Sequence, residues 1–122
     1  MRFAADSNPG VNLIRAYADG ALTINNEVLR SSLWVNATGL QTLPALQAAS
    51  ELQAEHADAL LQTDPEIVLL GTGAAQVFPP AAWRAKFLTR SIGLEVMTTA
   101  AACRTYNVLA SEMRRVTALL IP

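Results

Sequence analysis

The chain is poor in the residues that most often carry catalysis and metal binding. It contains one cysteine, Cys103, and one histidine, His56. A single cysteine excludes an internal disulfide and a cysteine-based metal cage, and it fits a reducing compartment. His56 stands among alanines and acidic residues, where a solvated surface histidine is the simplest interpretation, and Cys103 is expected to fill the core. We therefore expect no metal site and no cofactor, and thiol catalysis would require the fold to bring Cys103 and His56 together.

Charged residues are also scarce, at 16% of the chain with a formal net charge of −1. Such a chain has no overall field to attract phosphate backbones, so nucleic acid is not an expected partner. No apolar run approaches the ~20 residues that a spanning helix needs, so no membrane insertion is expected. Residues 1–12 resemble neither a signal peptide nor an arginine-rich transit peptide, which predicts a cytoplasmic protein in a bacterium.

Apolar residues, in contrast, make up 52% of the 122 residues. A domain of this size buries roughly two-thirds of its unfolded surface, enough for a core without metal or disulfide bonds. The sequence therefore predicts a single domain over residues 1–122, with residues 1–12 forming a tail or loop rich in turn formers. Because few charged residues remain to cover the surface, part of it is expected to contact a protein partner. The partner's identity and the oligomeric state stay open.

The order of the predicted elements indicates an α/β domain. Asp19-Gly20 separates two alternating runs, residues 14–18 and 21–25, which predicts a β-hairpin. Further strands are predicted at 33–36, 67–70, 94–97 and 116–121, and helices at 55–62, from Pro79-Pro80 to Gly93, and at 99–113. Since strands come first and then alternate with helices, we expect a mixed sheet with helices on at least one face.

Gly71-Thr72-Gly73 directly follows a run of four aliphatic residues, which is typical of a strand covered on both faces. Glycines at this point allow backbone N–H groups to approach a ligand, as in phosphate-binding loops. The residues that would complete a P-loop or a dinucleotide fingerprint are absent. Two interpretations stay open: a structural turn that needs unusual φ values, or a ligand site at the carboxyl end of a strand.

The helix predicted after Met97-Thr98-Thr99 has two distinct faces. Either threonine can cap the helix, and the other can face a pocket beside the glycine turn. Arg104 and Asn107 lie on the polar stripe, where solvation is the default interpretation. A partly covered arginine instead holds a carboxylate, a phosphate or a carbonyl. The opposite face of the helix is apolar and consists of Ala102, Tyr106, Leu109 and Met113. The carboxylates that could pair with Arg104 are Glu112, Asp6 and Asp64.

These motifs carry a resemblance to a known family. Gly71-Thr72-Gly73, Met97-Thr98-Thr99 and Arg104-Thr105-Tyr106-Asn107 are its most specific parts, and the likeness runs from about Ile14 to Ile121. The chain resembles the adipogenesis-associated Mth-like domain family, a domain of unknown function whose relatives include the mitochondrial complex I assembly factor 3. The resemblance implies a three-layer α/β domain with a mixed central sheet and an accessory β-hairpin, and it implies no reaction.

Two functions from different classes are compatible with the sequence. The first is a non-catalytic interaction protein that assists assembly of a membrane or respiratory complex, as the mitochondrial relatives do. The second is a small-anion-binding protein or uncharacterised enzyme; no catalytic residue is assigned, and the balance is against catalysis. Convergence of the candidate polar groups on a cavity would favour the second function, and an exposed apolar patch the first. The candidate ligand-binding residues are Gly71, Thr72, Gly73, Thr98, Arg104 and Asn107.

Overall fold

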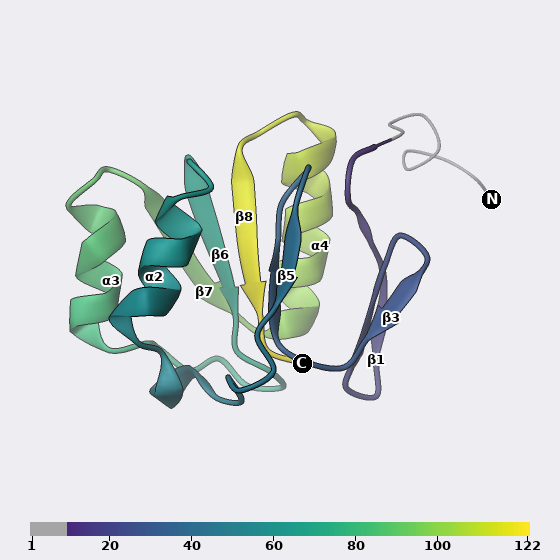
Figure 1. Cartoon of the computed structure of the whole chain (residues 1–122), viewed down its shortest axis with the longest axis horizontal. Coiled ribbons are helices and arrows are strands. Elements are labelled where there is room, and N and C mark those ends of the chain that lie inside the picture. The colour runs from purple at the N-terminus through teal and green to yellow at the C-terminus, as the bar shows by residue number, and fades with distance from the viewer. Residues whose placement is uncertain (1–9) are drawn as a thin grey trace.

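The computed structural model describes residues 10–122 and divides their strands between two sheets (Figure 1). The smaller sheet is antiparallel and consists of β1 (Ile14–Ala18), β2 (Ala21–Ile24) and β3 (Glu27–Leu29). The central sheet consists of β4 (Leu33–Val35), β5 (Leu40–Thr42), β6 (Ile67–Gly71), β7 (Gly93–Met97) and β8 (Val116–Leu120). The helical segments are a 3₁₀ helix, η1 (Ala49–Glu51), and the α-helices α2 (Ala54–Leu61), α3 (Ala81–Leu88) and α4 (Thr99–Ser111).

The central sheet is mixed, as predicted, with the strand order β5-β4-β8-β6-β7. Strands β8, β6 and β7 are parallel, whereas β4 and β5 are antiparallel to their neighbours. The chain moves outward from β6 to β7 through α3 and back past β6 to β8 through α4. Since crossovers between parallel strands are right-handed, reversing the direction along the sheet places the two helices on opposite faces.

The domain therefore has three layers, which confirms the expected architecture. Helices α2 and α3 cover one face of the central sheet, and α4 with the smaller sheet covers the other (Figure 1). Strand β8 lies in the middle and is buried along its whole length. Tyr106 of α4 and Phe87 of α3 are the largest fully buried side chains, one in each of the two core clusters.

The accessory hairpin forms where the Asp-Gly pair predicts it. Asp19 and Gly20 have φ values of 54° and 72°, the left-handed conformation that a two-residue hairpin turn requires. A second turn, with Asn25 at φ 56°, leads into β3. Strands β3 and β5 are not among the predicted elements; each has only three residues and lies at the edge of its sheet.

Two predicted helix features differ from the structure. Helix α3 ends at Leu88, and Gly93 is the first residue of β7 rather than the residue that stops the helix. Met113, expected on the apolar face of its helix, is 77% exposed, and Leu88, which the sequence predicts on the apolar side of the helix that begins at Pro79-Pro80, is 58% exposed. Leu88 lies about 100° around α3 from the buried Phe87, and Met113 lies beyond the end of α4 with φ 63°, so it does not continue the apolar face of that helix. Residues 1–9, which include most of the predicted tail and Asp6, lie outside the described residues.

Candidate functional site

The glycine turn lies where three parallel strands end side by side. In the sheet register, Gly71 stands opposite Met97 of β7 and Leu120 of β8. A Cβ atom on Gly71 would lie 3.0 Å from the Thr99 Cα atom and 3.1 Å from the Ala102 Cβ atom. Gly71 is therefore required because the start of α4 packs directly on the backbone of β6. Of the two glycines in the turn, Gly73, at φ +95°, is the one that uses the positive φ that glycine favours.

A buried threonine, Thr99, holds this turn closed. Its hydroxyl accepts a hydrogen bond from the Gly73 N–H at 2.7 Å and donates one to the Ile121 carbonyl at 2.6 Å. The Thr99 N–H in turn donates to the Gly73 carbonyl at 3.0 Å. Thr99 thus ties the turn, the first residue of α4 and the end of β8 together. The sequence predicted Thr99 either as a helix cap or as a residue facing a pocket beside the turn, since nothing local shows that its hydroxyl reaches two distant backbone groups.

The neighbouring threonines also form internal hydrogen bonds. The Thr72 hydroxyl donates to the Ala75 carbonyl at 2.6 Å and accepts from the Val77 N–H at 3.0 Å. Thr98 is the N-cap of α4, and its hydroxyl accepts from the Ala101 N–H at 3.3 Å. The groups expected to face a ligand at this edge therefore already have partners within the chain. Ligand binding by the turn stays a prediction.

Arg104 and Asn107 lie apart from the turn. Arg104 is five residues beyond Thr99, which places it about 7.5 Å along the helix and roughly 140° around it. Asn107 makes a paired hydrogen bond with the backbone of β1. Its Oδ1 accepts from the Ile14 N–H at 2.9 Å, and its Nδ2 donates to the Ile14 carbonyl at 2.7 Å. The Asn107 side chain thus pairs with the backbone of β1 as a neighbouring strand would, and these two hydrogen bonds link the smaller sheet to α4.

Arg104 is exposed and lines a small hollow between α4 and β1. The hollow has a volume of about 260 Å³ and also includes Arg15 and Tyr17. Within residues 10–122, no carboxylate lies within ion-pair distance of Arg104. The structure therefore brings Arg104 together with Asn107 and a second arginine, and not with the glycine turn.

The single cysteine and the single histidine both have structural surroundings. Burial raises the pKa of the Cys103 thiol to about 11, so the thiolate is a minor form at neutral pH. The His56 Nδ1 accepts the Gln53 N–H at 2.9 Å and completes a capping box at the start of α2. In the part of the chain that the structure describes, no group of three or more His, Cys, Asp or Glu side chains could hold a metal ion.

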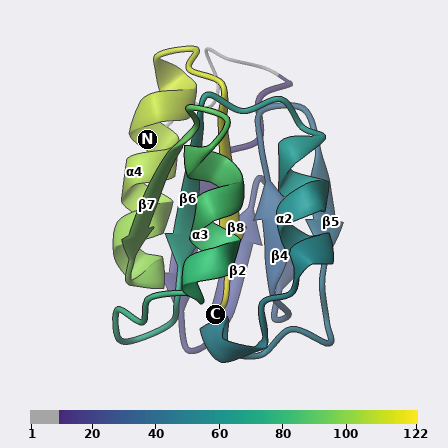
Figure 2. The same ribbon diagram turned by 90° about the vertical axis from the view of Figure 1, so that its left-hand side faces the viewer.

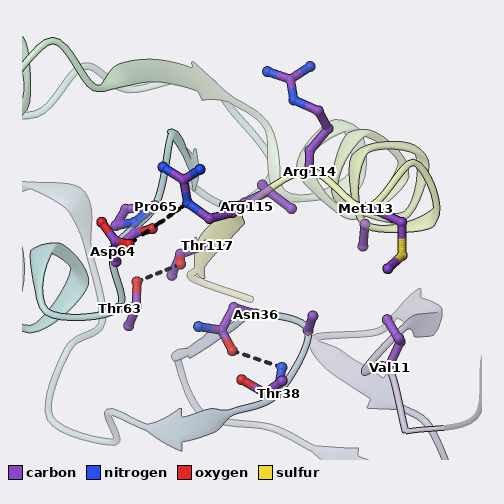
Figure 3. Close-up of a pocket in the computed structure, with 13 residues that line it drawn as sticks. Val11, Asn36, Thr38, Thr63, Asp64, Pro65, Met113, Arg114, Arg115 and Thr117 are labelled. Carbon is purple, nitrogen blue, oxygen red and sulfur yellow. Dashed lines mark hydrogen bonds and ion pairs between the residues drawn. The ribbon is translucent and has the colours of Figure 1, made fainter.

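A larger cavity, of about 380 Å³, lies at the opposite end of the sheet (Figure 3). Its polar groups are largely paired: the Thr63 and Thr117 hydroxyls are 2.7 Å apart, and the Arg115 Nε donates to the Asp64 carbonyl at 3.1 Å. The Arg114 side chain points away from it and binds Glu66, and this hydrogen bond lowers the pKa of the Glu66 carboxyl. Sequence reasoning missed this cavity because its walls come from segments that are far apart in the chain. The apolar walls are Val11, Ala37, Pro65, Ala110, Met113 and Val116.

Solved structures with the same fold define the class of this protein. A crystal structure from Bordetella parapertussis has a TM-score of 0.85 at 30% identity and covers 93% of this chain and 98% of its own. A Xanthomonas campestris protein has a TM-score of 0.82 at 40% identity, and the match covers 99% of this chain and 92% of that protein's chain. A Bordetella pertussis protein described as a Mth938-like domain has a TM-score of 0.80 at 26% identity, and the match covers 100% of this chain and 92% of that protein's chain. The fold is that of a Mth938-like α/β domain.

The chain belongs to the family described as "protein of unknown function (DUF498/DUF598)", which matches residues 14–121. Among curated relatives, the "13 kDa major membrane protein" of Francisella tularensis is 30% identical over 108 residues, 88% of each chain. The "NADH dehydrogenase [ubiquinone] 1 alpha subcomplex assembly factor 3" of Danio rerio is 41% identical over 63 residues, 52% of this chain and 36% of that protein. The family resemblance seen in the motifs is thus confirmed. Within residues 10–122, no helix has the length and apolar character needed to cross a bilayer.

Proposed function

We propose that this protein is a non-catalytic interaction protein that assists the assembly of a larger complex. One observation carries the proposal. At both places where the sequence suggests chemistry, the hydroxyl and amide groups bind the chain's own backbone, as the bonds of Thr72, Thr99 and Asn107 demonstrate. Such groups stabilise a fold and leave few directed groups for a substrate.

The relatives support the assembly part of this proposal. The Danio rerio relative is named as an assembly factor for NADH dehydrogenase, and the Francisella tularensis relative is named as a membrane protein. A role beside a membrane or respiratory complex, with the protein itself in the cytoplasm, accommodates both names. The chain's 52% apolar composition and its exposed large apolar side chains fit a surface that meets protein partners.

The experiment is deletion of the gene in its own organism, followed by native electrophoresis of the membrane complexes. We expect one complex to fall in amount while its partial assemblies accumulate, and the wild-type gene to restore it. Affinity capture from the same cells should recover subunits of the affected complex. Normal amounts of every complex together with no captured subunit would contradict the proposal.

Anion binding is a second candidate, because Arg15 and Arg104 line one hollow together with Asn107. Two guanidinium groups around one hollow suit a phosphate or carboxylate. Calorimetric titration with inorganic phosphate tests this candidate. Arg104→Ala should abolish binding, Arg104→Lys should fail to restore it because an ammonium lacks the planar fork, and Arg84→Ala on α3 is the matched control. Equal phosphate binding by all four proteins would leave Arg104 as a solvated surface residue.

A further inference from the structure

Strand β7 leaves one edge of the central sheet open. It is the last strand in the order β5-β4-β8-β6-β7, and no strand lies beyond it among residues 10–122. Figure 2 shows β7 as the outermost strand, with α3 on one side and α4 on the other. An open strand edge presents backbone donors and acceptors that can pair with another extended chain.

The backbone hydrogen bonds show which groups face outward. The Gly93 N–H donates to the Glu66 carbonyl at 3.2 Å, and the Met97 carbonyl accepts the Thr72 N–H at 3.0 Å, so these residues face β6. Because alternate residues of a strand point their backbone groups in opposite directions, Leu94 and Val96 face the open edge.

A side chain already occupies part of this edge. The Gln76 Nε2 donates to the Val96 carbonyl at 2.8 Å, as the N–H of an added strand would do. Gln76 itself is exposed, so a partner can displace its amide without opening the core. This bond also demonstrates directly that the Val96 carbonyl points away from β6.

Apolar side chains flank the edge on the α3 side. Leu94 and Val96 are half-buried and pack against the core cluster under α3. An added strand would therefore place every second side chain beside Leu94 and Val96, on the face that α3 covers.

The other side of the edge carries a negative charge. Met97 packs against the core cluster under α4, and by alternation Glu95 lies on the same face, where it is exposed. A strand that pairs with β7 would thus place a side chain beside the Glu95 carboxylate. A basic residue there would be favourable and an acidic one unfavourable.

We propose that the open edge of β7 binds an extended segment of a partner protein as an additional strand, with alternating apolar and basic residues. This inference rests on the proposed interaction function and identifies its surface and the chemistry of the partner. A second copy of the chain is a poorer occupant, because antiparallel pairing centred on β7 would set Glu95 beside its own counterpart. Like charges opposite each other weaken strand pairing.

The test uses a synthetic Val-Lys-Val-Lys-Val peptide and the full chain, followed by amide chemical shifts in NMR. We expect saturable shifts at Leu94, Glu95 and Val96 at millimolar peptide. A Val-Glu-Val-Glu-Val peptide should bind roughly twofold to fivefold more weakly, the range expected from one cross-strand charge pair. Glu95→Gln should remove that difference, whereas Glu55→Gln on α2 should leave it unchanged.

Backbone pairing is tested on the peptide, which avoids disturbing the fold. In two versions of the lysine peptide, N-methyl groups replace the N–H hydrogens on two complementary sets of alternate residues. Only one of the two versions therefore loses the N–H groups that face β7. We expect one version to lose binding and the other to keep it, since only an added strand distinguishes the two sets.

Equal binding of the two versions, or chemical-shift changes outside β7 when the peptide is added, would overturn the proposal. So would dimerisation of the chain through β7 in sedimentation measurements. Each of these outcomes is separate from the gene deletion, which tests the assembly role itself.

Discussion

Replacing Thr99 with valine tests whether the glycine turn is a locked structural element. Valine has nearly the shape of threonine, so the substitution removes the hydroxyl without opening a cavity. It leaves the Gly73 N–H and the Ile121 carbonyl without the partners that now lie at 2.7 and 2.6 Å. Thr99 is fully buried, so water cannot replace its hydroxyl without a rearrangement.

The expected loss follows from these two bonds. A buried polar group left without a partner costs about 1–3 kcal/mol, so two such groups lower the free energy of unfolding by about 2–6 kcal/mol. The lower half of this range is favoured because Gly73 is only half-buried and its N–H can recover some hydration. Domains of this kind have a total stability of about 5–15 kcal/mol, so the loss is large enough to measure with certainty.

Urea denaturation of three variants measures the effect. Thr99→Ser keeps the hydroxyl and should cost about 1 kcal/mol for the lost methyl group. Thr98→Val removes one long cap hydrogen bond and should also cost about 1 kcal/mol. If Thr99→Val unfolds within about 0.5 kcal/mol of Thr99→Ser, the two hydroxyl bonds contribute little. The turn would then be free to bind a ligand, and our account of it would be wrong.

Three further predictions follow from single residues. Gly71→Val and Gly73→Val should each lower the free energy of unfolding by more than about 2 kcal/mol, the first by overpacking against α4 and the second by φ strain; denaturant melts equal to wild type would contradict both reasons. Asn107→Leu should lower the free energy of unfolding by about 2 kcal/mol and increase amide hydrogen exchange in β1. Unchanged exchange there would show that the hydrogen bonds between Asn107 and Ile14 are not needed to hold β1 in place. Cys103 should resist iodoacetamide at pH 8 until the protein is unfolded. Because burial raises the pKa of its thiol from 9.0 to about 11, its contribution to stability should be lost as pH rises through that interval, which pH-dependent melts would detect.

Local patterns were sufficient to predict most of the fold. The Asp19-Gly20 pair predicts the hairpin because its backbone conformation is set within two residues. The aliphatic run before Gly71 predicts a strand covered on both faces, and the residues of β6 do pack into both core clusters. The three-residue strands β3 and β5 were missed because their position depends on the strands beside them and not on a pattern of their own.

The site was less predictable, since its contacts join distant parts of the chain. Two glycines flank Thr72, and the sequence does not show that one is needed for close packing and the other for its φ value.

The sequence by itself determined the order of the longer strands and helices and most of each helix's buried face, because these depend on propensities and periodicity within a few residues. Only the tertiary structure decided what each polar group does. Asn107 binds Ile14 across 93 residues, and Thr99 joins two strand ends that no local pattern connects. The physical reason is that periodicity records which side of a helix is apolar, whereas a hydrogen bond depends on where the packed core places a second segment within 3 Å of the first.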